Sequence, residues 1–335
     1  MGAGDRGTPI RSCVRLRPLS AAEVASGQRS MWEVHGSAVR LLPKALKADG
    51  RAVWLADSEY VFDAAFAPEV ETTDVYEAAA SDIASAVLAG CSCTLIAFGQ
   101  TASGKTFTML GGAGAMGSGG ADIFGATAAP GLISLAFRDL LRLLEGEAGT
   151  SGTPQAYGLK MSCVEVYNEQ CNDLLAPANT NLRLYEGAGG AVVVRGVSEV
   201  AISSEVQLWG AMQVAEAQRR VGSTHSNDRS SRSHLVVTVS VESWARDARV
   251  GGVNLPTTRT LQLVDLAGSE RCNLTTTGPE RGMGAESHSA ADMLMRESSR
   301  INRLERVGSA VGWRPDCGVG VGCGRVVDAM RVAWA

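Results

Sequence analysis

The segment from Gly99 to Thr106 constrains the fold of this chain more than any other. It reads Gly-Gln-Thr-Ala-Ser-Gly-Lys-Thr and fits the pattern GxxxxGK[ST] of a phosphate-binding loop. Residues 94–98 before it (TLIAF) form the short, continuous apolar run expected of a strand buried on both faces. Such a loop needs a buried strand before it and a helix after it, and this context argues against a chance match in a glycine-rich chain. The sequence therefore predicts the strand, loop and helix of a nucleotide-binding α/β fold.

The loop also predicts a chemistry. Its glycines allow the backbone to curl, so that successive N–H groups point at phosphate oxygens, and the positive end of the following helix adds to the attraction. We expect Lys105 to reach the β- and γ-phosphates and the Thr106 hydroxyl to bind Mg²⁺. The residues expected to contact the nucleotide here are Gly99, Gln100, Thr101, Ala102, Ser103, Gly104, Lys105 and Thr106. The loop alone indicates a nucleoside triphosphate and does not select among NTPases.

Periodicity in the rest of the chain predicts alternating strands and helices. Apolar runs or alternation indicate strands at 10–16, 94–98, 159–167, 235–241 and 260–264. Amphipathic spacing indicates helices at 72–88, capped by Thr72 or Thr73 and ended by Gly90, at 132–144, and from Ser203 or Ser204 to about 220. Residues 111–129 are Gly/Ala-rich, which is typical of a flexible surface insertion. The pattern predicts an α/β fold with a central, mostly parallel or mixed sheet and helices on both faces.

Composition limits the classes of partner. The 335 residues are 45% hydrophobic, enough for one large domain or two small ones. A formal net charge of −4 does not favour binding to nucleic acid or to an acidic membrane. The chain shows no signal peptide and no apolar run of about 18 residues, so we expect a soluble, intracellular protein with no membrane partner. The eight cysteines lack zinc-binding spacing and are expected to be reduced.

Two later segments carry further chemistry. Residues 227–234 (NDRSSRSH), here called the Ser/Arg segment, would on their own suggest a linker or a phosphorylation patch. Residues 265–270 (DLAGSE), here called the DLAGSE segment, follow an apolar strand. An acid at the end of such a strand, here Asp265, is where nucleotide-binding folds place a second Mg²⁺ ligand, often through water. Gly268 can bring a backbone N–H close to the γ-phosphate.

The chain resembles the kinesin motor domain in six stretches that occur in the order of that family. They are VRLRPLS (14–20), FDAAFAPEVETTDVYE (62–77), LIAFGQTASGKTFTM (95–109), VEVYNEQCNDLL (164–175), NDRSSRSH (227–234) and LQLVDLAGSER (261–271). The resemblance spans residues 14–271 and continues more weakly to Val311. It implies that Arg15, Arg17 and Pro18 lie against the adenine. Phe107 and Tyr76 would lie on the other side or edge of the ring.

The resemblance also implies roles in the two later segments. Ser230 and Ser231 would belong to a first switch, with Ser231 near Mg²⁺ and the γ-phosphate and Asn227 helping to hold the switch around the phosphates. Arg232 and Glu270 would form a salt bridge that closes when ATP is bound. Ser231 and Glu270 would order the attacking water and relay its proton. The expected catalytic residues are Lys105, Ser230, Ser231, Arg232, Gly268 and Glu270, and the expected Mg²⁺ ligands are Thr106, Ser231 and Asp265.

As a whole, the resemblance implies an ATP hydrolase that uses Mg²⁺, is stimulated by microtubules and works on the cytoskeleton in the cytoplasm. The alternative is a truncated, non-motile homologue that binds nucleotide or tubulin without productive cycling. An unrelated P-loop GTPase is disfavoured, because the chain has no Asn-Lys-x-Asp motif and the Arg-x-Arg-Pro element at 15–18 argues for adenine. No coiled-coil heptads are present, so the oligomeric state is not predicted.

The chain also departs from the family pattern. Residues 131–135 lack the usual proline and arginine, and residues 301–311 are one residue short of the family's helix. A one-residue deletion turns the rest of a helix by about 100°. Nothing matches after Val311. We therefore expect a motor-like domain at 8–311 without its last strand and helix, and an unmatched segment at 312–335 that is a disordered tail or a gene-model artefact.

Overall fold

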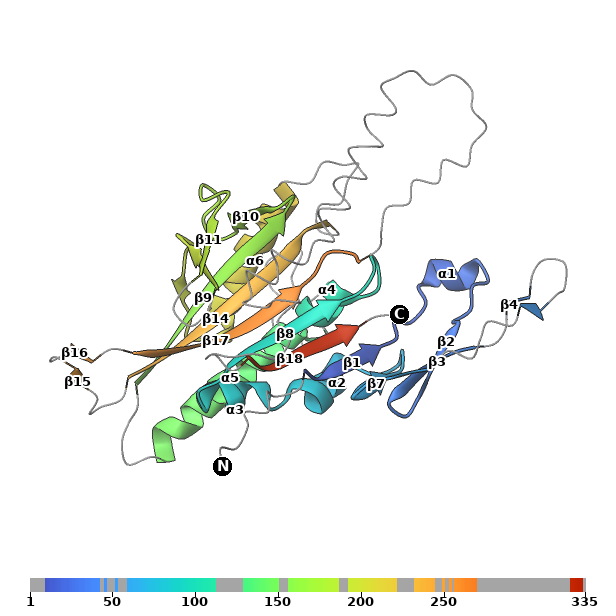
Figure 1. Ribbon diagram of the computed structural model, residues 1–335, viewed down its shortest axis with the longest axis horizontal. Helices are drawn as coiled ribbons and strands as arrows, with labels where there is room; N and C mark the ends of the chain where they lie inside the picture. The colour runs from blue at the N-terminus through green and yellow to red at the C-terminus, as the bar shows by residue number, and fades with distance from the viewer. Residues whose placement is uncertain are drawn as a thin grey trace, which may run out of the picture.

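The computed structural model describes residues 10–42, 45–46, 52–53, 59–112, 129–150, 156–186, 192–221, 232–244, 249–250, 253–254, 256–269 and 326–333. These residues build a nine-stranded sheet, four smaller sheets and six helices (Figure 1). The large sheet has the order β10-β9-β14-β17-β8-β18-β1-β7, and β13 pairs with β9 at its edge.

The strands of the large sheet run in both directions. Their bounds are β1 Ser12–Arg15, β7 Ala64–Phe66, β8 Ser92–Phe98, β9 Ala156–Tyr167, β10 Gln170–Asp173, β13 Val200–Ala201, β14 His234–Trp244, β17 Thr257–Asp265 and β18 Val326–Ala333. From β17 to β7 all neighbours are parallel, whereas β9, β10, β13 and β14 pair in antiparallel fashion with their neighbours. The sheet is therefore mixed, as predicted.

Smaller elements surround this sheet. They are β2 Trp32–His35, β3 Ala38–Leu41, β4 Ala45–Leu46, β5 Ala52–Val53, β6 Glu59–Val61, β11 Arg183–Glu186, β12 Val192–Arg195, β15 Arg249–Val250 and β16 Val253–Asn254. The helices are α1 Ala21–Ala25, α2 Thr72–Ala80, α3 Ile83–Leu88, α4 Lys105–Leu110, α5 Leu132–Thr150 and α6 Glu205–Val221. Among the described helices, none combines the length and apolar character needed to cross a membrane.

The main core lies on one face of the sheet, where helices α2 to α6 pack. Strand side chains alternate between faces, so Leu95 and Ala97 of β8 point into this core and are fully buried. Phe137 of α5 is also fully buried, and α5 contacts α2, α3, α4 and α6. The neighbours Ile96 and Phe98 face the opposite side, where they meet a smaller cluster that includes residues of the β11–β12 hairpin.

The described helices α2–α6 thus cover one face. We predicted helices on both faces; residues 270–325, between β17 and β18, lie outside the described part of the chain. The same holds for residues 113–128, most of the predicted Gly/Ala-rich insertion. The expected buried cysteines, outside any disulfide, are found in strands at Cys13, Cys93, Cys163 and Cys171.

The predicted helix 72–88 is divided in two. The chain turns at Ser81 and Asp82, between α2 and α3. The reason is tertiary: Arg11 donates to both carboxylate oxygens of Asp82, at 3.0 and 2.9 Å, and to the Ala79 carbonyl at 2.8 Å. These bonds compete with a continuous helical ladder. The predicted threonine cap is also wrong, because the N-cap is Glu71 and makes no side-chain cap bond.

Residues 326–333, part of the segment expected to be a disordered tail or a gene-model artefact, form a strand in the centre of the sheet. Strand β18 pairs in parallel with β1 on one side and with β8 on the other (Figure 1). Without it, β1 and β8 would each expose an unpaired row of N–H and C=O groups, which is costly in a sheet interior. The sequence of this segment lacks clear alternation and therefore gave no strand signal.

Candidate nucleotide site

The phosphate loop joins the end of β8 to the start of α4. Gly104 caps α4 with φ of +103°, a conformation that favours glycine. Lys105 opens the helix with only 7% of its surface exposed. Its ammonium donates to the carbonyl oxygens of Gly99 at 2.9 Å and Gln100 at 2.8 Å. The loop therefore curls around its own lysine, and the predicted strand–loop–helix arrangement is present.

Thr106 and Asp265 meet beside this loop. The Thr106 hydroxyl donates to Asp265 Oδ2 at 2.6 Å. The contact follows from the sheet, because β17 and β8 are parallel neighbours and Asp265 is in register with Ala97. Parallel strands end at the same edge, which brings an acid after β17 next to the loop after β8. Two of the three residues predicted to hold Mg²⁺ are thus in contact.

The residues at this contact fit a magnesium ion. Asp265 is 3% exposed, and its Oδ1 has no hydrogen-bond partner within the described part of the structure. Burial raises the pKa of this carboxyl, and the bond from Thr106 and the nearby cations Arg219 and Lys105 oppose that rise. A hydroxyl and a carboxylate oxygen are the hard oxygen donors that Mg²⁺ prefers. A buried carboxylate with one oxygen uncommitted is suited to a cation.

The DLAGSE segment is attached to the loop by its backbone. Leu266 N–H donates to the Ala97 carbonyl at 3.2 Å and Ser269 N–H donates to the Gly99 carbonyl at 3.0 Å. Ala267 N–H donates to His234 Nδ1 at 3.0 Å. Gly268 therefore lies between two anchored residues next to the phosphate loop. The contact of its amide with the γ-phosphate stays a prediction.

Only the end of the Ser/Arg segment lies in the described part of the chain. Arg232 is half-buried there, and Ser233 and His234 follow it into β14. Asn227, Ser230, Ser231 and Glu270 lie outside the described residues. Their roles, including the expected Arg232–Glu270 salt bridge, stay predictions.

A buried charged network that the sequence analysis missed lies behind the site. Arg219 of α6 is 2% exposed and donates to Glu216 at 3.1 Å and to Ser233 Oγ at 3.2 Å. Its Nε lies 3.9 Å from Glu165 of β9, which is 1% exposed. An arginine near the end of an amphipathic helix normally suggests a solvated charge, so no sequence pattern indicated this burial.

Arg15 is buried, and its predicted contact with the adenine stays a prediction. It is 6% exposed and donates to Thr72 Oγ1 at 3.0 Å, Thr108 Oγ1 at 2.9 Å and the Val70 carbonyl at 2.7 Å. Its guanidinium carbon lies 5.7 Å from the centre of the Phe107 ring, which is 45% exposed. Burial lowers its pKa. Arg15 therefore packs against the Phe107 ring. The Phe107 ring is the more exposed of the two side chains and remains a candidate for contact with a base.

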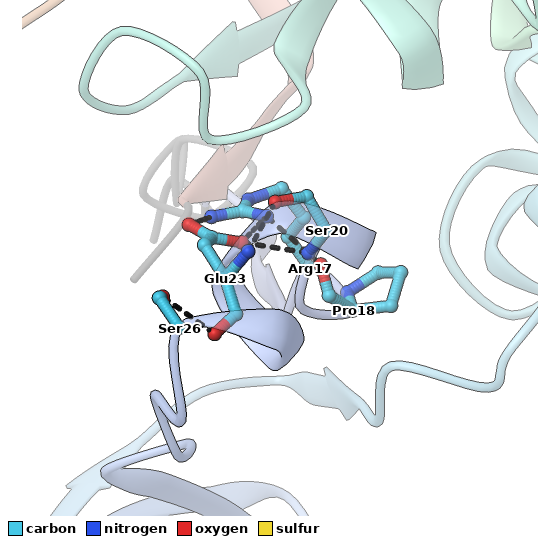
Figure 2. A network of polar contacts seen from close by, with 5 residues as sticks. All are labelled: Arg17, Pro18, Ser20, Glu23 and Ser26. Carbon is cyan, nitrogen blue, oxygen red and sulfur yellow. Dashed lines mark hydrogen bonds and ion pairs between the residues drawn. The ribbon is translucent and has the colours of Figure 1, made fainter.

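Arg17 and Pro18 remain at the surface (Figure 2). Arg17 donates two hydrogen bonds to the Glu23 carboxylate, both at 2.8 Å, and one to the Pro18 carbonyl at 2.9 Å. Glu23 also accepts from Ser20 N–H at 2.6 Å, and the Ser20 hydroxyl accepts from Glu23 N–H at 3.3 Å. This capping box starts α1 and fixes the plane of the Arg17 guanidinium. Ser-x-x-Glu at 20–23 is the sequence signal that could have revealed it.

Tyr76, the other aromatic residue expected near the adenine, is buried between two helices. It is 5% exposed, and its hydroxyl donates to Asp139 of α5 at 2.8 Å. Burial and the neighbouring Asp139 carboxylate raise the pKa of this phenol. Tyr76 thus joins α2 to α5, and its contact with the adenine stays a prediction.

Comparison with known proteins decides the family. The sequence profile of the kinesin motor domain family matches residues 15–311. The chain belongs to the kinesin motor family. This motor domain is 35% identical over 291 residues to the kinesin-like protein KIN-7A of Oryza sativa subsp. japonica. It is 32% identical over 298 residues to the kinesin-related protein 4 of Dictyostelium discoideum, and 35% identical over 276 residues to the mitochondrial kinesin-like protein KIN-7D of Arabidopsis thaliana.

The matches cover most of this chain and a minor part of each relative. They cover 87%, 88% and 82% of the chain, and 26%, 14% and 23% of the three relatives in the same order. The chain therefore spans about a quarter or less of these proteins. A solved structure of a fast kinesin matches with a TM-score of 0.69, covering 97% of this chain and 84% of that one at 24% identity, which supports the kinesin motor fold.

Proposed function

We propose that this kinesin motor domain binds and hydrolyses ATP with Mg²⁺, and couples hydrolysis to binding of microtubules. The observation that carries the proposal is the meeting of Thr106, Asp265 and the DLAGSE segment at the phosphate loop. Because the DLAGSE segment is hydrogen-bonded to the backbone of the phosphate loop, it can respond to the outermost phosphate of a bound nucleotide. Coupling between that phosphate and a movable segment is what an ATP-driven motor requires.

The loop binds the triphosphate. Backbone amides from Gly99 to Thr106 surround the phosphates, and the Lys105 ammonium exchanges its two carbonyl acceptors for phosphate oxygens. Those carbonyl bonds hold the ammonium at the loop, so little rearrangement is needed. Lys105 then neutralises charge on the β- and γ-phosphates.

Thr106 and Asp265 hold the metal, with Ser231 as the third proposed contact. When bound, Mg²⁺ neutralises phosphate charge and orients the terminal phosphate. Asp265 Oδ1 has no hydrogen-bond partner among the described residues, and the Thr106–Asp265 bond keeps both side chains at the mouth of the loop. Thr106 and Asp265 thus present their oxygen atoms to the metal from positions that are already fixed before the metal binds.

Around the terminal phosphate, the chain supplies positioning and charge more than a strong base. Gly268 N–H donates to a γ-phosphate oxygen, and Ser231 and Glu270 orient the attacking water and carry its proton. Ser230 and Asn227 help hold the Ser/Arg segment around the phosphates. Arg232 pairs with Glu270 when the segments close.

The adenine lies between Phe107 and the surface formed by Arg17 and Pro18. The Arg15 guanidinium supports Phe107 and sets the position of its ring. The Glu23 carboxylate fixes the Arg17 guanidinium in one plane, which favours stacking on a flat base.

The proposed partner is the microtubule, and the proposed location is the microtubule cytoskeleton of the cytoplasm. A steady-state ATPase assay with and without microtubules, together with pelleting, tests this function. We expect slow basal turnover that rises with microtubules, and loss of turnover in Lys105→Ala. Failure of the purified chain to bind Mg-ATP at millimolar concentration would reject the proposal. Tubulin binding without turnover would identify a non-motile binding module instead.

A further inference from the structure

Two consecutive residues connect the Ser/Arg segment to the rest of the site. Ser233 precedes β14, and His234 is its first residue; they are buried, with 1% and 5% of their surface exposed. Ser233 Oγ accepts a hydrogen bond from Arg219 of α6 at 3.2 Å. His234 Nδ1 accepts a hydrogen bond from the backbone N–H of Ala267 at 3.0 Å. The start of β14 is therefore attached to α6 on one side and to the DLAGSE segment on the other.

The bond to His234 differs from the other anchors of the DLAGSE segment. Leu266 N–H and Ser269 N–H donate to main-chain carbonyls, which any residue type would supply. Ala267 N–H donates to a side chain, so this anchor depends on the identity of residue 234. An Nδ1 that accepts a hydrogen bond carries no proton, which places the proton of the neutral imidazole on Nε2.

Gly268 lies between the anchors at Ala267 and Ser269. Glycine has the widest conformational range of any residue, so its own backbone does not determine where its N–H points. The direction of that N–H is set by the neighbouring peptide groups, and these are held by His234 on one side and Gly99 on the other. Loss of either anchor would let the Gly268 amide rotate.

We propose that His234 is a positioning residue that aims the Gly268 amide at the terminal phosphate of a nucleoside triphosphate. The inference rests on the proposed ATPase function, because it assigns a phosphate to that amide. Through the same bond, a displacement of the DLAGSE segment is transmitted to β14 and the end of the Ser/Arg segment. His234 thereby makes the two segments respond together to one phosphate group.

The proposal predicts a selective effect on triphosphates. A diphosphate has no oxygen at the place of the terminal phosphate, so its affinity does not depend on the Gly268 amide. A general weakening of the fold would instead lower the affinities for diphosphate and triphosphate together. The ratio of the two affinities therefore separates a positioning role from a structural one.

Three substitutions separate the acceptor from the ring. His234→Phe keeps a flat ring and removes the acceptor. His234→Asn places an amide oxygen close to the position of Nδ1 and keeps an acceptor for Ala267 N–H. His234→Gln carries its amide oxygen one methylene farther out, toward the position of Nε2, and so loses the acceptor for Ala267 N–H. Ser240→Ala, on the same strand, is the matched control.

The experiment measures binding of Mg-ADP and of a non-hydrolysable Mg-ATP analogue to the 335-residue chain, with steady-state ATPase and melting temperature for each variant. We expect His234→Phe and His234→Gln to lower the preference for triphosphate by about tenfold, the effect of one hydrogen bond to a charged group. Their kcat should fall while ADP affinity stays within about twofold. His234→Asn should recover most of the loss, and Ser240→Ala should match the wild type.

Unchanged triphosphate preference in both His234→Phe and His234→Gln would overturn the inference while leaving the ATPase function intact. A parallel loss of both affinities in His234→Asn and His234→Gln would also overturn it, because the acceptor would then make no difference. A wild-type chain that binds neither nucleotide would reject the proposed function itself, and the inference with it. If His234→Phe does not fold, the comparison of Asn with Gln still decides the question.

Discussion

The hydroxyl of Thr106 donates a 2.6 Å hydrogen bond to Asp265 Oδ2, and so joins two residues that are 159 positions apart in the chain. Thr106 belongs to the first turn of α4, whereas Asp265 is the last residue of β17. The bond fixes the start of the DLAGSE segment against the phosphate loop. The bond is thus a direct link between the residues proposed to hold the nucleotide and that segment.

The first prediction concerns this hydroxyl. Thr106→Val keeps the shape of the side chain and removes the oxygen, so Mg²⁺-dependent ATP affinity should fall by about tenfold or more. Thr106→Ser keeps the hydroxyl and should retain most of the affinity. Calorimetric titration of ATP with and without Mg²⁺ measures both. Equal Mg²⁺ dependence in Thr106→Val and in the wild type would contradict the assignment of Thr106 as a ligand.

The second prediction concerns Lys105. Replacing it with alanine removes the ammonium that is held at the loop by Gly99 and Gln100, and should abolish Mg-ATP binding at millimolar concentration. The matched control is Lys160→Ala, which removes a partly exposed lysine paired with Glu242 on the sheet. This control should bind nucleotide like the wild type. Retained affinity in Lys105→Ala would place the phosphates elsewhere.

The third prediction concerns acid and the Arg17–Glu23 pair. Bonds from Arg17 and Ser20 lower the pKa of Glu23 from 4.5 to about 2. Because the folded pKa lies below the unfolded one, the pair stabilises the fold above pH 4.5, and this contribution is lost as the pH falls toward 2. NMR titration of the Glu23 carboxyl should give a midpoint near 2, and in Arg17→Ala a clearly higher one. A midpoint unchanged by Arg17→Ala would show that the pair does not form in solution.

The fourth prediction concerns β18. Val332 pairs with Cys13 of β1 and with Ala97 of β8. Val332→Pro removes an N–H from an interior strand and should lower the free energy of unfolding by about 3 kcal/mol or more. Val332→Thr keeps the N–H and the β-branched shape and should cost far less. Urea denaturation followed by circular dichroism measures both, and equal midpoints would place residues 326–333 outside the sheet.

The phosphate loop could be predicted from the sequence because its structure depends on residues that are adjacent in the chain. The position of Asp265 could also be predicted, since an acid after a buried strand reaches the same sheet edge as the loop. The break at Ser81 could not, because it depends on Arg11, about 70 residues away. The burial of Arg15 could not be predicted either, because an arginine in this motif gives the same sequence pattern whether it lies at the surface or beneath Phe107.

The hydrogen bond from Ala267 N–H to His234 is even harder to predict from a sequence. Its donor is a backbone amide, which every residue except proline has, so no pairing of residue types indicates it. The role of β18 was hidden for a related reason. A strand with parallel neighbours on both sides needs no alternation of apolar and polar residues, and residues 326–333 carry little of it.

The central place of β18 also has a consequence for synthesis. Strands β1 and β8 leave the ribosome early, yet the strand that bridges them is complete only when residue 333 has emerged. Until then, β1 and β8 each lack one of the two parallel neighbours they have in the folded chain. Unpaired strand edges bind other extended chains readily, so the newly made protein should depend on chaperones until the bridge closes.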